Sequence, residues 1–275
     1  ALGYIGGGAL LGINLIMLKY PDWLGFPVGY FTVQDCFFSV ALWWLIFSLP
    51  TFLFLRERTK KILPSFGKSY FSEAYQRLQH TFRRIKTFRE LTKFLVAYLV
   101  YNDGIETVII MASIFGAEVL GMETGEIILF FLIIQGIAFF GSLIFGFLAD
   151  AIGNKKTVMI SLGIWSLIVI WAFQLGIIWG PKTEYWILGV LTGIVLGGSQ
   201  AASRSLQGIF TPDANSAEFF GFFAVSGKFA SVFGPLIYGI LIVITGSVQS
   251  GILSVLLFFI VGMAILWTVN EKKGL

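Results

Sequence analysis

The chain has 275 residues, of which 57% are hydrophobic and only 12% are charged. Because a soluble domain has about 45 to 50% apolar and about 25% charged residues, this composition excludes a soluble globular domain and indicates an integral membrane protein. The single cysteine, Cys36, and the single histidine, His80, exclude a disulfide framework, a Cys/His zinc site and a Cys–His nucleophile pair within this chain, and the sequence predicts no cofactor.

Apolar stretches long enough to cross a bilayer recur along the whole chain. They predict eight transmembrane helices, at roughly 1–18, 31–55, 91–115, 126–148, 157–179, 186–208, 217–243 and 248–268. These stretches lack the apolar–polar alternation of β-barrel strands. The expected fold class is therefore all-α, a polytopic transmembrane helical bundle. The first apolar run has neither an initiating Met nor a basic region before it, which predicts a fragment of a longer protein.

Most of the basic residues lie between the second and third predicted spans. Eleven of the nineteen Lys and Arg residues fall between Arg56 and Lys93, against three acids. Because cytoplasmic connections are enriched in Lys and Arg, we expect this segment to be cytoplasmic. Counting spans outward from it places Lys155, Lys156 and both ends of the chain on the same side. The net charge of +4 arises from this segment and does not predict a nucleic-acid partner.

Part of this basic segment has helical periodicity. Ser72 is suited to a helix N-cap, and apolar residues follow it at three- and four-residue spacing, namely Tyr75, Leu78, Phe82 and Ile85. The pattern predicts an amphipathic helix on the inner leaflet, with membrane lipids as its partner. Two interpretations stay open: regulation through anionic lipid headgroups, or a tether whose charge only sets the topology.

The third predicted span contains acids at its centre. Its core, Leu95 to Ala112, reads LVAYLVYNDGIETVIIMA, and Asn102, Asp103 and Glu106 fall on one helical face. An ionisable side chain at bilayer depth costs about 2.5 to 3.5 kcal/mol on insertion scales. These residues therefore indicate a polar pathway through the membrane.

The connection between the fourth and fifth predicted spans carries a motif. It reads Gly146-Phe-Leu-Ala-Asp150-Ala-Ile-Gly153-Asn-Lys155-Lys156. This resembles the conserved loop of the major facilitator superfamily, roughly G-x-L-x-D-x-x-G-R-K/R, although Asn154 stands where an Arg is usual. In that superfamily the loop joins the second and third helices of each six-helix half. The resemblance implies a major facilitator fold that lacks its first four helices, with helices five to twelve present.

Other stretches resemble the vacuole-effluxer-like branch of that superfamily, the autophagy-related permeases. They are Gly3–Gly8, Trp43–Pro50, Tyr101–Thr107, Gly197–Ser205 and Glu218–Pro235. Eukaryotic members of the branch are implicated in releasing amino acids from the vacuole. The resemblance implies a monomeric permease for a small solute, most specifically amino acids, with proton coupling as an option. It implies the plasma membrane for a prokaryotic protein and the vacuolar membrane for a fungal one.

The resemblance also divides the chain and implies a conformational latch. The expected parts are the last two helices of the N-terminal half, the basic linker between the halves and the C-terminal six-helix half, at 1–55, 56–90 and 91–270. The implied latch comprises Gly146, Asp150, Gly153 and Lys155. Asp150 is expected to face the cytoplasmic end of the first span, and the first span is expected to pack on the fourth.

In the superfamily, helices seven, eight, ten and eleven line the central cavity. Here those helices carry six polar residues that we expect to form the substrate and coupling site: Asn102, Asp103, Glu106, Gln135, Gln200 and Lys228. Lys228 is the nearest cation in depth to Asp103, so a pair is expected in at least one conformational state. A permanent ion pair, a pair broken by a proton or a zwitterionic substrate, and no pair at all remain open. Arg204 is expected to snorkel to the headgroups rather than to form a gate.

Two further classes of function stay open beside transport of a small solute. One is a lipid translocator and the other is a non-transporting scaffold or receptor. An enzyme is not expected, because the spans hold no His-rich, Cys-based or G-x-S-x-G constellation. Nucleotide-driven pumping is not indicated either, since the phosphate-binding G-x4-G-K-[ST] pattern does not occur.

Overall fold

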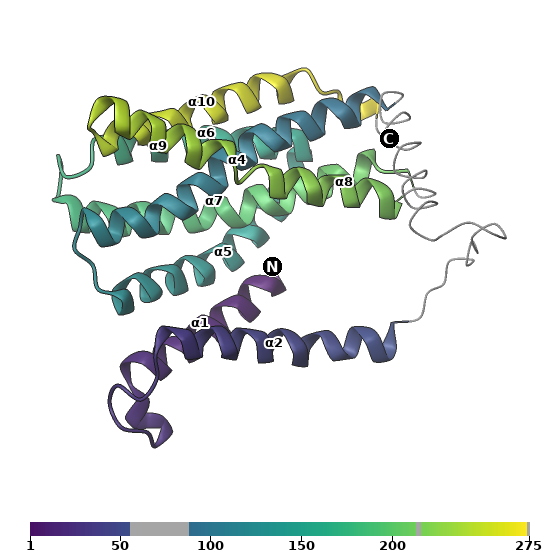
Figure 1. The fold of residues 1–275 in the computed structure, drawn as a ribbon. Helices are drawn as coiled ribbons and strands as arrows, with labels where there is room; N and C mark the ends of the chain where they lie inside the picture. The colour runs from purple at the N-terminus through teal and green to yellow at the C-terminus, as the bar shows by residue number, and fades with distance from the viewer. Residues whose placement is uncertain (56–87, 213–215, 274–275) are drawn as a thin grey trace, which may run out of the picture.

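The computed structural model describes residues 1–55, 88–212 and 216–273, and these ranges are dominated by long helices (Figure 1). The helices are α1 (Leu2–Lys19), η1 (Pro21–Leu24), α2 (Val33–Phe54), α4 (Arg89–Glu118), α5 (Thr124–Ile152), α6 (Asn154–Phe173), α7 (Pro181–Phe210), α8 (Ser216–Phe229), α9 (Phe233–Thr245), α10 (Val248–Trp267) and η3 (Glu271–Lys273). Eight units are long and apolar enough to cross a membrane, with α8 and α9 counted as one. The eight predicted spans and the all-α class are confirmed. The predicted amphipathic helix lies outside the described residues.

The helices fall into two groups of unequal size. Figure 1 shows α1 and α2 as a pair below a bundle formed by α4 to α10. Within the described ranges α2 buries none of its side chains, whereas α1 packs along α5. The expected packing of the first span on the fourth is confirmed. Thus α1 is the element that joins the pair to the larger bundle.

Glycines allow α5 and α7 to pack closely. A Cβ atom at Gly197 of α7 would overlap the carbonyl oxygen of Ala138, and one at Gly141 of α5 would overlap the carbonyl oxygen of Ile194. Gly193 lies on the same face, where a Cβ would come 3.0 Å from the carbonyl oxygen of Ile134. Helices in lipid associate by van der Waals packing, which small residues permit. The contact between α5 and α7 is therefore close enough to bring backbone atoms of the two helices together.

The seventh span is interrupted, although its apolar run predicts a continuous helix over 217–243. Helix α8 ends at Phe229 and α9 begins at Phe233. The cause is Pro235, which has no N–H and whose ring clashes with the carbonyl of Ser231 in a continuous helix. Pro235 is tolerated as the third residue of a new helix. The two helices therefore meet at a bend between residues 230 and 232.

The fifth span ends at Phe173, six residues earlier than predicted, because the following loop folds around Glu184. The Glu184 side chain is fully buried. Its carboxylate accepts hydrogen bonds from the backbone N–H groups of Gly176, Ile178 and Trp179 at 2.8 to 2.9 Å, and from the Trp171 indole at 3.1 Å. A buried carboxylate needs such donors to offset its desolvation. Glu184 therefore organises the connection between α6 and α7.

We expect Gly197→Ala to destabilise the protein by about 1–3 kcal/mol, the usual cost of overpacking, because the new methyl group meets backbone atoms of α5. Gly163→Ala on α6 is the matched control, since a Cβ there meets nothing within 4 Å. Thermal unfolding of both variants in detergent measures the difference. Equal melting temperatures for the two variants would show that the α5–α7 contact is not tight.

Candidate functional site

A central cavity of about 510 Å³ lies inside the larger bundle. Its walls come from α4, α5, α6, α7, α9 and α10, and the start of α1 closes part of one side. The volume falls in the range of about 300–1,000 Å³ that is common for small-molecule sites. The lining is mostly aliphatic and aromatic, with a few polar side chains.

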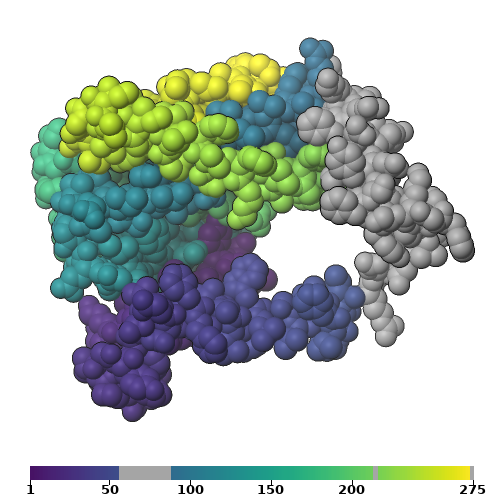
Figure 2. Space-filling view, viewed as in Figure 1, coloured from purple at the N-terminus to yellow at the C-terminus, as the bar shows by residue number. Residues whose placement is uncertain are grey.

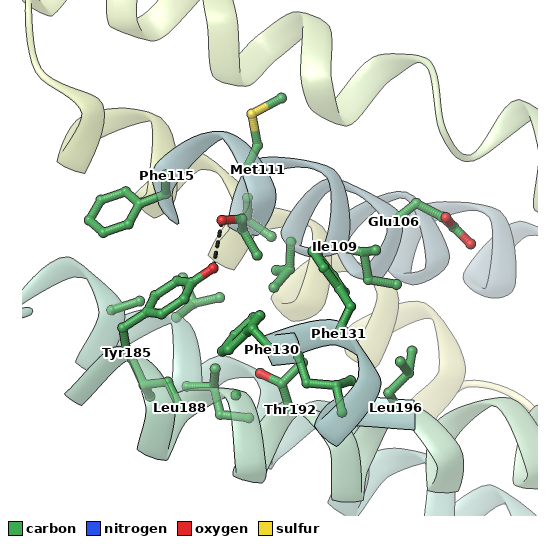
Figure 3. Close-up of a pocket in the computed structure, with 18 of the residues that line it drawn as sticks. Glu106, Ile109, Met111, Phe115, Phe130, Phe131, Tyr185, Leu188, Thr192 and Leu196 are labelled. Carbon is green, nitrogen blue, oxygen red and sulfur yellow. Dashed lines mark hydrogen bonds between the residues drawn. The ribbon is translucent and has the colours of Figure 1, made fainter. Parts of the chain in front are cut away.

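One end of the cavity is aromatic. Figure 3 shows Phe115 of α4, Phe130 of α5 and Tyr185 of α7 gathered there. The Tyr185 ring stacks on Phe130 with centroids 4.4 Å apart, and its hydroxyl donates a hydrogen bond of 2.7 Å to the carbonyl oxygen of Ala112. The Tyr185 hydroxyl is thus held by the backbone, and this end of the cavity is lined mainly by ring surfaces.

The polar lining is displaced along α4 and α7 from this aromatic end. Glu106 lies about 14 Å of helical rise from Phe115 along α4. On α7, which runs antiparallel to α4, Gln200 and Arg204 lie well beyond Tyr185 in the direction of Glu106. The cavity therefore changes from aromatic to charged along its length, and this suits a solute with one apolar and one charged part.

Tyr4 connects the two groups of helices across the polar end. Its hydroxyl, carried by α1, donates a hydrogen bond of 2.9 Å to Oε1 of Gln200 on α7. Gln135 of α5 faces α1, because its Nε2 lies 3.2 Å from the position that a Cβ on Gly7 of α1 would take. The sequence does not distinguish Tyr4, because a tyrosine near a helix end is common in any span.

The structure brings together three of the six predicted site residues. Glu106, Gln135 and Gln200 line the cavity. Asn102, Asp103 and Lys228 are not part of the lining. No ion pair joins Asp103 to Lys228, although both belong to the described part of the chain.

Asn102 and Asp103 instead contact the bend in the seventh span. The Asp103 side chain is 1% exposed, and its Oδ1 accepts a hydrogen bond of 2.9 Å from the N–H of Gly234. Nδ2 of Asn102 lies 3.4 Å from the carbonyl oxygen of Gly227, to which it donates. Their position on the face of α4 next to Glu106 is as expected, but their partners in this structure are backbone atoms.

Two cations lie on helices that were expected to line the cavity. Lys228 is exposed at the end of α8 and forms no ion pair with Asp103 among the described residues. Arg204 is exposed and also lines the cavity. Its expected position at the headgroups stays a prediction.

The expected latch residues are divided between two environments. Gly153, with φ of 93°, ends α5, and the carboxylate of Glu271 accepts hydrogen bonds from the N–H groups of Asn154 and Lys155 at 2.9 and 3.2 Å. Nζ of Lys155 donates to two backbone carbonyls at the end of α10, those of Trp267 and Val269, at 2.7 and 2.6 Å. Each helix end is thus capped by a charge from the other segment.

The other two latch residues make no such contacts. Asp150 is exposed and has no hydrogen bond to any described residue, and its expected position opposite the first span stays a prediction. A Cβ at Gly146 would meet nothing within 4 Å. A second contact supports the cap instead, because the Glu90 carboxylate of α4 accepts a hydrogen bond of 2.6 Å from the N–H of Asn270.

The described residues form eight membrane-length spans, seven of which contribute to the walls of a solute-sized cavity, and this defines a polytopic membrane protein with an internal cavity. The family described as vacuole effluxer Atg22 like matches residues 1–275, so the chain belongs to that family.

Named relatives support this assignment. The "Uncharacterized MFS-type transporter YxiO" of Bacillus subtilis is 30% identical over 277 residues, which are 99% of this chain and 62% of that protein. "Autophagy-related protein 22-1" of Aspergillus niger is 27% identical over 291 residues, covering 99% of this chain and 46% of that protein. The protein of the same name from Penicillium rubens is 25% identical over 293 residues, covering 99% and 48%. The chain thus spans between about half and three fifths of the length of these relatives.

We expect Glu271→Ala to destabilise the protein by about 0.5–2 kcal/mol, the usual cost of losing a helix N-cap, because two N–H groups of α6 lose their acceptor. Glu118→Ala, at an exposed position near the end of α4, is the control. Thermal unfolding in detergent provides the measurement. A loss no larger than that of the control would contradict the capping role of Glu271.

Proposed function

We propose that the full-length protein is a secondary active permease that moves a small amphipathic solute, specifically an amino acid, through the cavity by alternating access. The observation that carries this proposal is the change along the cavity from aromatic rings to Glu106, Gln200 and Arg204. A zwitterionic head group suits the charged end, where Glu106 can face the ammonium group and Arg204 the carboxylate. An apolar side chain suits the aromatic end. Membership of the effluxer family supports the same class of activity.

Proton coupling is part of this proposal, with Glu106 as the coupling residue. A carboxyl group inside a membrane is a common element of proton relays. Glu106 lies within the cavity lining, so solute and proton would act on the same group. Gln135 and Gln200 would provide uncharged hydrogen bonds to the solute.

We also propose how the chain is oriented in the membrane and that a single copy of the protein transports the solute. The excess of Lys and Arg between 56 and 93 supports a cytoplasmic location for that segment and for both ends of the chain. The polar end of the cavity would then open toward the cytoplasm. A monomer suffices for this mechanism, because the cavity lies within a single chain.

A lateral groove favours a lipid translocator as the second candidate. It has a volume of about 290 Å³, lies between α1 and α5, and is lined mainly by small and apolar side chains. Tyr4 and Gln135 line both the groove and the central cavity. A route from the cavity to the lipid phase would pass between these two side chains.

Uptake of labelled neutral amino acids into proteoliposomes, with and without an imposed pH gradient, tests the proposal. We expect the pH gradient to drive accumulation by the wild type. Glu106→Gln should reduce that accumulation at least about tenfold, because a gradient of about one pH unit supplies about 1.4 kcal/mol per proton, which corresponds to a tenfold ratio. Glu126→Gln is the control, because Glu126 forms a partly exposed ion pair with Lys182 outside the cavity lining.

Each result has a separate meaning. Accumulation that survives in Glu106→Gln would remove Glu106 from the coupling pathway. The absence of amino-acid flux in a folded wild type would contradict the amino-acid proposal. Movement of a fluorescent phospholipid between leaflets of the same vesicles would then favour the lipid translocator.

A further inference from the structure

Three consecutive apolar side chains project from the connection between α6 and α7. Ile177, Ile178 and Trp179 are 74%, 60% and 60% exposed in the described structure. They belong to residues 174–180, which we call the 174–180 loop. Apolar side chains that are exposed together mark a surface that contacts a partner. The described residues do not cover this surface, so its partner lies outside them.

The backbone under these side chains is fixed by Glu184. The buried carboxylate accepts hydrogen bonds from the N–H groups of Gly176, Ile178 and Trp179. Gly176 has a φ of 96°, a conformation that glycine adopts without steric cost. The loop thus turns its backbone N–H groups inward, toward Glu184, and its apolar side chains outward. The apolar surface is a built part of the fold.

The length of α6 places the loop at a membrane boundary. Helix α6 has 20 residues, from Asn154 to Phe173. At a rise of about 1.5 Å per residue it is about 30 Å long, which equals the thickness of the hydrocarbon core. Lys155 and Lys156 mark one end of this helix, and lysines favour the headgroup level. The loop follows the other end directly, where hydrocarbon meets headgroups.

An exposed apolar face of α6 leads into the loop. Ile160, Leu167, Ile170 and Phe173 are exposed, and their spacing puts them on one side of the helix. In a helix of membrane length such a face contacts lipid. The loop continues this face without a polar break between Phe173 and the exposed isoleucines other than Gln174.

The loop lies away from α1 and α2. Helix α6 packs along α7 and α10, whereas α1 packs along α5. Figure 2 shows the purple and blue atoms of α1 and α2 below the larger bundle, and the teal-green surface at the left end of the bundle includes the connection between α6 and α7. The surroundings of the loop are therefore those of the outer side of the bundle.

A lipid interface suits both parts of the loop. Irregular backbone is tolerated at membrane depth only where its polar groups have partners, and Glu184 supplies an acceptor for three loop N–H groups. The remaining polar groups of the loop find partners at the headgroup level. Tryptophan is enriched at that level, because its ring is apolar while its N–H donates to polar groups.

We propose that the 174–180 loop is a membrane anchor, and that Ile177, Ile178 and Trp179 insert among the lipid headgroups and upper acyl chains. Glu184 is the positioning residue, since it holds the loop backbone without contacting lipid. The anchor fixes the depth of the start of α7, where Tyr185 lines the aromatic end of the cavity. The anchor does not depend on which solute the protein moves.

The accessibility of a spin label tests the anchor in the full-length protein in phosphatidylcholine liposomes, after its native cysteines, Cys36 included, are replaced by serine. Ile178→Cys carries the label in the loop. Leu167→Cys on α6 is the hydrocarbon reference, and Glu118→Cys at the end of α4 is the water reference. All three positions are exposed. Oxygen concentrates in lipid and a polar nickel chelate in water, so their relative collision rates with the label report its depth.

We expect the label at position 178 to lie about 5–10 Å below the headgroup boundary, the depth reached by interfacial apolar residues. Its ratio of oxygen to nickel collisions should be closer to that at position 167 than to that at position 118. A ratio equal to that at 118 would place the loop in water. Protection from both reagents would show that protein covers the loop. Either of these two results would overturn the anchor.

Glu184→Gln tests the positioning role. An amide has one acceptor oxygen, and its NH2 group opposes the backbone N–H donors of the loop. We expect the label at 178 to become more mobile and shallower, and the label at 167 to keep its depth. Glu126→Gln is the matched control, because Glu126 pairs with Lys182 and does not bond to the loop. An unchanged label at 178 in Glu184→Gln would overturn the role of Glu184.

Quenching of tryptophan fluorescence by brominated lipids requires neither a label nor a variant of Glu184. We expect the wild type to lose a quenchable component when Trp179 is replaced, in Trp179→Phe. Trp165→Phe is the control, since Trp165 is fully buried and out of reach of lipid. Equal lipid quenching in the wild type and in Trp179→Phe would contradict the anchor, whatever the result of a transport assay.

Discussion

A bilayer provides no water for the polar groups of a buried helix, and this constraint explains where the polar side chains inside the protein lie. The Glu184 carboxylate is placed where three loop N–H groups need an acceptor. Asp103 is placed where the start of α9 exposes another. In both cases burying the acid costs free energy, but its carboxylate accepts hydrogen bonds from backbone N–H groups that would also cost free energy if they were buried without a partner. The acid and the irregular backbone therefore require each other.

Hydropathy predicts the spans well because membrane insertion depends on the same quantity, the apolar length of a segment. It predicts bends poorly, since Pro235 hardly changes the mean hydropathy of its span while removing one backbone donor. The cavity residues Glu106, Gln135 and Gln200 could be predicted because a polar residue in a long apolar run usually faces the protein interior.

The partner of Asp103 could not be predicted in the same way. Similar depth in the membrane suggested Lys228, but pairing also requires that both side chains point toward each other. In the described structure Lys228 is exposed, whereas Asp103 is buried.

Magnitudes indicate which contacts of the protein can open. Across the polar end of the cavity, α1 is held to α7 by the hydrogen bond from Tyr4 to Gln200, and one neutral hydrogen bond contributes only about 0.5–1.5 kcal/mol net. Within the larger bundle, α5 and α7 meet through backbone atoms at Gly141 and Gly197. A separation there would lose many van der Waals contacts at once. Helix α1 also packs along α5, so its attachment to the bundle is this packing together with one hydrogen bond.

The cap formed by Glu271 has a consequence for biogenesis. Glu271 follows α10 in the chain, so the ribosome releases it only after all eight spans have been synthesised, whereas the N-terminus of α6 that it caps is made more than a hundred residues earlier. During synthesis the first turn of α6 must use other acceptors, such as lipid headgroups or water. These ends of α6 and α10 can come together only once α10 has entered the membrane, which makes this contact a late step in the assembly of the described helices.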